Sequence, residues 1–209
     1  DGEVFDLSRN EEIFQSKTHL LFKRNIFVPT EFLAKRKEDN YDNTSEKNIQ
    51  ITESFIKKFI YQMVNEDAEK SDYIINWLAY YFQNLKKTGT ALVLLGDSEV
   101  TEKLFWNLIK RIFGNKYCSA INDAEYKTAL LQDIVKDKLF FNIGDIKNAG
   151  TKFYDDTLAL IVKDLLIQQS VEYTNDKGEE ERVEIHGQLL ITATNPAPYL
   201  KKSLSKCTV

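Results

Sequence analysis

A polar stretch at residues 96–103 has the outline of a phosphate-binding loop, because it follows an apolar run at 91–95 and precedes an amphipathic pattern. In the motif G-x-x-x-x-G-K-[ST], backbone amides and a helix N-terminus hold phosphate groups, and the lysine neutralises the outer ones. Gly96 matches the first glycine, and Asp97 and Ser98 follow it. This part of the sequence therefore predicts a turn suited to phosphate.

The rest of the motif carries altered residues. Thr101 stands for the second glycine, Glu102 for the lysine and Lys103 for the hydroxyl that would hold Mg²⁺. A carboxylate in place of an ammonium group repels phosphate, so we expect nucleotide binding weaker by several kcal/mol than in an intact loop. A structural turn without a ligand is the alternative. The candidates for a degenerate nucleotide site are Gly96, Asp97, Ser98 and Lys103.

Two further polar residues follow apolar runs. Asp145 comes after the run at 139–143 and Gly144, and Asn195 comes after the run at 189–194. A carboxylate at a strand end can hold Mg²⁺ or act as a base in phosphoryl transfer, and an amide can orient the attacking water. We take Asp145 and Asn195 as catalytic candidates. A capping Asp, and an Asn that precedes proline in a turn, explain the same residues equally well.

The chain from about residue 90 to 199 alternates apolar runs of strand length with helical patterns. This alternation predicts an α/β fold with a mostly parallel sheet and a site along its carboxyl edge. Gly114 is expected to end the helix that follows the polar loop. The predicted strands are 91–95, 139–143 and 189–194, the helices are 103–113 and 154–166, and a hairpin joins 171–174 to 182–185.

Composition divides the chain into an N-terminal segment or linker at 1–48, a helical subdomain at 49–88 and the α/β core at 89–209. The acidic start lacks an initiator Met, and the C-terminal residues form no clear final element. We therefore expect internal boundaries of a longer chain, with the core truncated at its C-terminal end.

The predicted helical subdomain contains two stretches in which apolar residues recur at helical spacing, from Phe55 to Met63 and from Ile74 to Leu85. They predict two amphipathic helices whose aromatic residues belong to the core. Thr52 or Ser54 is expected to cap the first helix.

The overall composition excludes some classes of protein. A hydrophobic fraction of 43% is enough for a folded core, and a net charge of −4 is unlike a dedicated nucleic-acid-binding domain. Cys118 and Cys207 form no metal-ligand spacing with His19 and His186, so we predict free thiols in a reducing compartment and no metal site on these residues. No apolar run is long enough for a transmembrane helix, and no membrane partner is expected.

The order of these elements resembles the superfamily 3 helicases, an AAA+-like group, and within it the phage and plasmid primase-helicase type. The likeness covers about residues 50–200, and the helicase-like C-terminal part of deep-sea-vent phage primase-polymerases is closer still. It is carried by the stretches 76–80, 88–96, 105–109 and 190–195.

The resemblance implies an AAA+-like P-loop core preceded by a small helical subdomain, with ATP and Mg²⁺ as cofactors. It also implies a homo-oligomeric ring, expected to be a hexamer, that acts in DNA replication on single-stranded DNA. The resemblance further implies an N-terminal primase-polymerase domain of the same protein as a partner. It implies the cytoplasm of a bacterial host as the location.

Departures from the family pattern put ATP hydrolysis in doubt. The family's phosphate-loop residues fall on Thr101, Glu102 and Lys103, and one of its paired acids falls on Gly144. The family's DNA-gripping hairpin residue falls on Lys177, although acidic residues follow closely and a plain solvated hairpin is an equal alternative. The family's arginine that acts on a neighbouring subunit, expected after Asn195, cannot be placed in this sequence.

Three hypotheses remain. The chain is a ring that holds single-stranded DNA with weak or lost ATPase activity, an active NTP-driven helicase that uses Lys103 and Asp145, or an assembly scaffold. Loss of turnover in a Lys103→Ala variant would favour the helicase. Strand binding that depends on Lys177 would argue against the scaffold.

Overall fold

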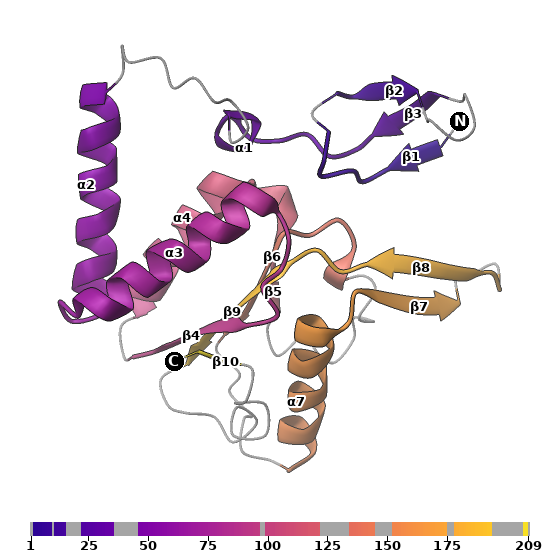
Figure 1. Cartoon of the computed structure of the whole chain (residues 1–209). Helices are drawn as coiled ribbons and strands as arrows, with labels where there is room; N and C mark the ends of the chain where they lie inside the picture. Colours follow the sequence, from indigo (N-terminus) through magenta and orange to yellow (C-terminus); the bar gives the residue numbers. More distant parts are fainter. Residues whose placement is uncertain are drawn as a thin grey trace. The chain divides into compact units, whose positions relative to one another are not determined.

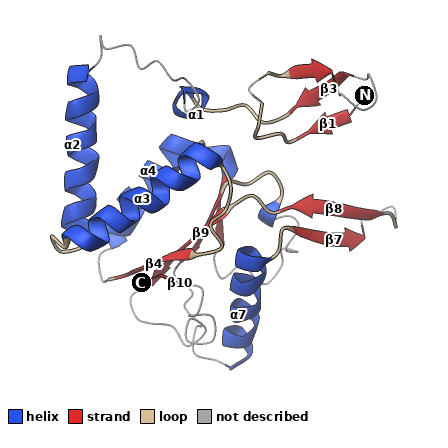
Figure 2. Cartoon of the chain, viewed as in Figure 1, coloured by secondary structure: helices blue, strands red, loops and turns tan. Residues whose placement is uncertain are grey.

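The computed structural model describes residues 2–9, 11–15, 22–35, 46–96, 99–121, 134–144, 152–174, 178–193 and 207–208 (Figures 1 and 2). The chain divides into two compact units. The first comprises Asp1–Ala34 and Lys86–Val209, and the second comprises Lys35–Leu85. The sheet unit thus includes N-terminal residues that composition alone separated from the core.

A parallel sheet forms the centre of the first unit. Its strands lie in the order β10-β4-β9-β6-β5, and every neighbouring pair is parallel. The mixed α/β fold with a parallel sheet is therefore confirmed. The five strands are β4 (Ala91–Leu95), β5 (Cys118–Ile121), β6 (Phe140–Gly144), β9 (Gln188–Ala193) and β10 (Cys207–Thr208).

Helices α4 (Glu99–Phe113) and α7 (Lys152–Ile167) pack on the sheet. Successive strand residues point to opposite faces. Phe141 belongs to a buried cluster with Val162 and Leu165 of α7, whereas the ring of Phe140 lies 4.8 Å from that of Phe113 in α4. The sheet is therefore covered by a different helix on each face.

Helix α4 follows the predicted pattern but starts earlier than expected. Phe105, Ile109 and Phe113 are fully buried at a spacing of four residues, which is one face of a helix. The helix ends before Gly114, whose φ of 97° lies in the range that glycine favours. Its start at Glu99 precedes the predicted start at residue 103.

The predicted hairpin is present in the first unit. Strands β7 (Ser170–Thr174) and β8 (Glu180–Glu184) pair antiparallel, with Val171 opposite Val183. Figure 1 shows them as a two-stranded arm that extends from the end of α7.

A small N-terminal sheet belongs to the same unit. It contains β1 (Gly2–Val4), β2 (Ile13–Gln15) and β3 (Phe22–Asn25), in the order β1-β3-β2, and the short helix α1 (Glu31–Lys35) follows.

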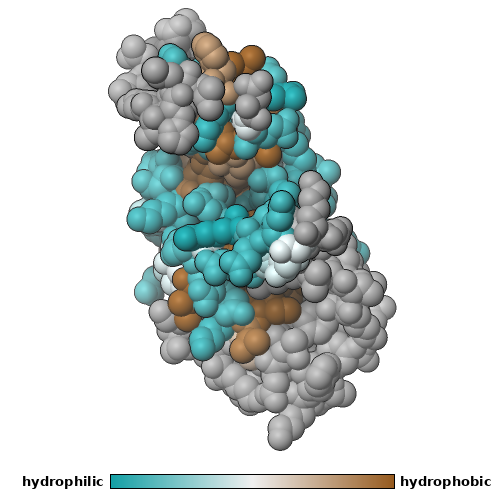
Figure 3. Space-filling model, turned by 90° about the vertical axis from the view of Figure 1, so that its right-hand side faces the viewer, coloured by the Kyte–Doolittle hydropathy of each residue, from teal (hydrophilic) through white to brown (hydrophobic). Residues whose placement is uncertain are grey.

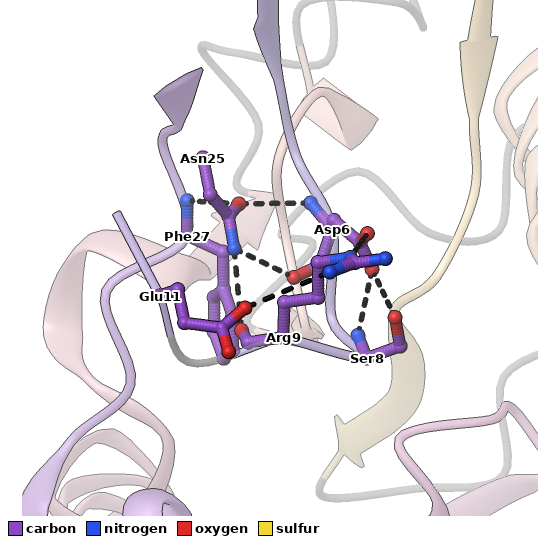
Figure 4. Close-up of polar contacts among 6 residues, drawn as sticks. All are labelled: Asp6, Ser8, Arg9, Glu11, Asn25 and Phe27. Carbon is purple, nitrogen blue, oxygen red and sulfur yellow. Dashed lines mark hydrogen bonds and ion pairs between the residues drawn. The ribbon is translucent and has the colours of Figure 1, made fainter. Parts of the chain in front are cut away.

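The side chain of Asn25, which is 1% exposed, holds this sheet together (Figure 4). Its oxygen accepts hydrogen bonds from the backbone amides of Asp6 and Phe27, both at 3.0 Å, and its amide donates to the carbonyls of Asp6 and Arg9. The side-chain carboxamide of Asn25 thus uses both of its N–H donors and both acceptor positions of its oxygen. This is expected because buried polar groups are generally hydrogen-bonded.

Contacts with Tyr117 attach this N-terminal segment to the parallel sheet. The Tyr117 hydroxyl accepts a hydrogen bond from the Val28 amide at 2.6 Å and donates to the Val28 carbonyl at 3.0 Å. The rings of Phe5, Phe27 and Tyr117 lie 5.2–5.6 Å apart. Tyr117 ends the short 3-10 helix η2 (Asn115–Tyr117), directly before β5.

The second unit consists of the two predicted helices, α2 (Glu46–Met63) and α3 (Ala68–Asn84). Trp77 and Tyr81 are buried, which confirms that they are core aromatics, whereas Phe55 of α2 is 73% exposed, so its expected place in the core is wrong. Asp67 caps α3 by accepting a hydrogen bond from the Lys70 amide at 3.1 Å. The predicted cap at Thr52 or Ser54 is wrong, since both residues lie within α2.

Candidate functional site

The chain connections place a topological switch point between β4 and β9. The connection from β4 runs through α4 to β5 at one edge of the sheet, whereas the connection from β9 leads to β10 at the other edge. Ligands of open α/β sheets bind in the crevice outside the carboxyl ends of strands at such a point. The candidate loop after β4 is therefore in the position that this fold uses for ligands.

Gly96 lies at this switch point. Its backbone amide donates a hydrogen bond to the Ala193 carbonyl at 3.1 Å, and Leu95 pairs with Ala193 in the sheet. The start of the loop thus adjoins the end of β9, as the predicted common edge requires. Of the site residues predicted from sequence, Gly96 and Lys103 are described, whereas Asp97, Ser98, Asp145, Lys177 and Asn195 lie outside the described residues.

The connection between β4 and α4 is short. Strand β4 ends at Leu95 and α4 begins at Glu99, so Thr101, Glu102 and Lys103 belong to the helix. Lys103 is exposed, while Thr101 and Glu102 are half-buried. Acidic residues in a first turn complement the helix dipole, which favours this early start. The negative charge of such residues also repels a phosphate group that would bind to the backbone amides of that turn.

The end of β6 has no room for a second acid. A Cβ atom added at Gly144 would lie 2.6 Å from Oγ1 of Thr192, which is 5% exposed on the paired strand β9. A carboxylate at this position would require Thr192 to move. Local packing therefore disfavours an acid at the position where the family pattern has one.

Asn142, two residues before Gly144, was not expected from the sequence. Its Oδ1 atom is buried and accepts no hydrogen bond. Asn142 and Gly144 share the face of β6 that α4 covers, because side chains alternate along a strand. The sequence did offer one signal for this residue, because it is polar and stands inside an apolar run. Leaving a buried acceptor without a hydrogen bond costs about 1–3 kcal/mol, so a polar residue at such a position calls for an explanation.

These residues do not fit a site for ATP and Mg²⁺. Glu102 occupies the lysine position within a helix, and Gly144 offers no ligand and no space for one. We therefore derive no catalytic step through the nucleotide.

Three groups with shifted pKa values lie at the opposite, amino edge of the sheet. Burial raises the pKa of the Cys118 thiol to about 12 and lowers that of the His186 imidazole. Burial also lowers the pKa of Lys87 to about 8, although its ammonium group donates to the carbonyls of Leu165 and Gln168 near the end of α7. These three residues stand at or just before β5, β9 and β4.

The face that carries the β7–β8 hairpin is mostly hydrophilic over its described surface (Figure 3). The charged residues among the described hairpin residues are mostly acidic, and the Tyr173 hydroxyl donates to Glu181 at 2.6 Å. This charge disfavours the phosphate contact expected at the hairpin turn. Within the described residues, no helix is long and apolar enough to cross a membrane.

Comparisons with known proteins agree with the fold. No protein-family model matches the chain. Over 160 residues the chain is 25% identical to the DNA primase-polymerase of Nitratiruptor phage NrS-1, which covers 75% of this chain and 20% of that protein.

Solved structures of the same phage protein's C-terminal region also match. One apo structure superposes with a TM-score of 0.69 at 18% identity, covering 91% of this chain and 42% of that one. The A form superposes with a TM-score of 0.66 over the same shares. The chain is thus similar in sequence to a phage DNA primase-polymerase and shares the fold of that protein's C-terminal region.

Proposed function

We propose that the chain is a helicase-like, AAA+-type module of a phage primase-polymerase that serves DNA replication with weak or lost ATPase activity. In this proposal it forms a ring, expected to be a hexamer, that holds single-stranded DNA in the cytoplasm of a bacterial host. A primase-polymerase domain of the same protein would act on the strand that the ring holds.

One observation carries the proposal: a strand, a glycine and a helix stand at the switch point, while the residues that would bind phosphate are altered. Gly96 adjoins β9, as the loop of a P-loop core should, but α4 begins at Glu99 and takes up Glu102 and Lys103. The likeness to the NrS-1 C-terminal region supports the role in replication. Together they favour a helicase fold without a working nucleotide site.

A ring without ATPase activity still helps replication through avidity. Several subunits that each hold one strand weakly raise the effective concentration of that strand near an attached polymerase. The acidic net charge of −4 is compatible with this role, because a few basic residues per subunit suffice when subunits repeat.

The proposal is tested by measuring the mass of the full chain by light scattering, with and without oligo(dT) of 40 nucleotides. We expect a stable oligomer that binds the strand without ATP, with an affinity that falls as salt rises. A monomer that binds no strand at 50 mM salt would overturn the proposal.

A further inference from the structure

A pocket of about 410 Å³ lies at the amino edge of the sheet, away from the degenerate loop. It is formed where the N-terminal segment meets the residues just before β5 and β6. Its lining includes Lys116, Lys136 and Lys138, one acid, Asp137, and the aromatic residue Phe5. Ligand pockets of this size are concave, partly apolar and carry a few converging polar groups.

Backbone and side-chain contacts hold the lysines near one another. The Lys138 ammonium donates to the Lys116 carbonyl at 2.6 Å, which joins the two loops of the pocket. The Lys116 ammonium lies 4.6 Å from the ring centre of Tyr117. Asp137 has a φ of 57°, and the Lys138 amide donates to the Val135 carbonyl, so residues 135–138 form a tight turn.

The positive charge of the pocket is not neutralised within the described part of the chain. There, Lys116, Lys136 and Lys138 form no ion pair with a carboxylate, and Asp137 is the only acid in the lining. The last turn of α4, shortly before Lys116 in the sequence, contains Lys110 and Arg111, which do not line the pocket. Such a concentration of cations is notable in a chain with a net charge of −4.

We propose that this pocket binds phosphodiester groups of a single-stranded nucleic acid. Ammonium groups act on phosphates as point charges and contact the backbone without selecting a sequence. The pocket is larger than one phosphate group, and Phe5 supplies an apolar wall for a sugar or base. The inference rests on the proposed function and assigns its strand contact to the amino edge instead of the hairpin turn.

The test compares two double variants that lose the same charge. Lys116→Gln/Lys136→Gln changes the pocket, and Lys58→Gln/Lys163→Gln changes two exposed lysines elsewhere. Each full-length chain is titrated into fluorescently labelled oligo(dT) of 20 nucleotides at 50 and 200 mM salt. Thermal denaturation confirms that both variants fold as the unaltered chain does.

We expect the pocket variant to bind about 10-fold more weakly at 50 mM salt, with the control within about twofold of the unaltered chain. Two lost phosphate contacts should also reduce the slope of log K against log salt by about 1.4. Competition by dTMP at the same phosphate concentration should be weak, because a mononucleotide carries one phosphate group whereas a strand presents several linked ones.

Different failures have different meanings. If the unaltered chain binds no strand, the proposed function and this inference both fail. If the unaltered chain binds but the two double variants bind equally, only the pocket assignment fails. If the pocket variant instead loses its oligomeric mass while keeping strand affinity, the lysines contact an acidic surface of a second copy, and the inference is overturned.

Discussion

The two edges of the parallel sheet differ in chemistry. The carboxyl edge has the geometry of a ligand site, with Gly96 hydrogen-bonded to Ala193, but its loop continues into a helix with Glu102 at the lysine position. The amino edge lies away from the usual ligand position of this fold, yet it carries the basic pocket around Lys116 and Lys136.

Under the proposed function, the difference means that the fold keeps the frame of a site whose phosphate-binding residues are altered. Sheet order and packing depend on buried apolar residues such as Ile191, Val93 and Phe105. Phosphate binding depends on a few exposed residue types, which can change at little cost to stability. Fold likeness therefore supports the architecture here and not the reaction.

The largest expected effect is a difference in the free energy of unfolding between substitutions of two glycines at opposite edges of the sheet. A Cβ atom at Gly187, just before β9, would lie 2.1 Å from the ring of Phe141, whereas a Cβ atom at Gly96 meets nothing within 4 Å. We expect Gly187→Ala to lower the free energy of unfolding by about 3 kcal/mol. Gly96→Ala should change it by less than about 0.5 kcal/mol. Urea denaturation of both variants measures the contrast, and equal values would contradict the packing described here.

Restoring the phosphate-loop motif at the carboxyl edge should give that edge the affinity for ATP that the altered residues prevent. The triple variant Thr101→Gly/Glu102→Lys/Lys103→Thr replaces a repulsive carboxylate with an ammonium group and returns a hydroxyl. We expect it to gain about 2 kcal/mol of ATP affinity, or roughly 30-fold, in a fluorescent-nucleotide titration.

Asn107→Lys on the same helix is the control for added positive charge, and it should gain no ATP affinity. A restored variant without ATP affinity would show that the helical backbone from Glu99, and not the residue types alone, excludes the nucleotide.

At the amino edge, Tyr117→Phe removes the hydroxyl that joins the N-terminal segment to the sheet. Both hydrogen bonds to Val28 are lost, and we expect a loss of about 1 kcal/mol in the free energy of unfolding. Tyr80→Phe changes a half-exposed hydroxyl in the other unit and serves as the control. A Tyr117→Phe variant as stable as the unaltered chain would mean that ring packing alone holds the segment.

The smallest expected effect is a dependence of stability on acidity at His186. Burial lowers the pKa of this imidazole in the folded chain, and the nearby Glu184 carboxylate, 3.4 Å away, only partly offsets that effect. The unfolded chain therefore binds more protons just below pH 6.5, so stability is full above that pH and falls as the pH is lowered. His186→Gln should reduce the dependence of the free energy of unfolding on pH, as measured by urea denaturation between pH 7.5 and 5. An unchanged slope would exclude His186 as its source.

Sequence patterns predicted the elements whose apolar residues recur regularly. The runs that became β4, β6 and β9 consist almost wholly of apolar residues, and α4 buries Phe105, Ile109 and Phe113 at helical spacing. Local signals of this kind need no knowledge of distant contacts.

Elements that depend on distant contacts were not predicted. Strand β5 has only four residues, among them Cys118 and Ser119, and it exists because it pairs with β6. The N-terminal strands depend on Asn25, whose partners Asp6 and Arg9 lie 19 and 16 residues away, respectively. The start of α2 before Thr52 and the Asp67 cap of α3 were likewise missed, because helix ends are weakly specified by periodicity.

The candidate site was predictable in position but not in detail. The polar residues after the apolar runs indicated the carboxyl edge, and Gly96 lies there. The pocket at the amino edge was not predicted, because its lysines come from separate loops and carry no motif.

The central claim is tested most directly by ATP hydrolysis of the full chain, with and without oligo(dT), beside the Lys103→Ala variant. We expect turnover that is absent or so weak that neither the strand nor Lys103→Ala changes it. Turnover that the strand stimulates and that Lys103→Ala abolishes would contradict it and establish a working motor.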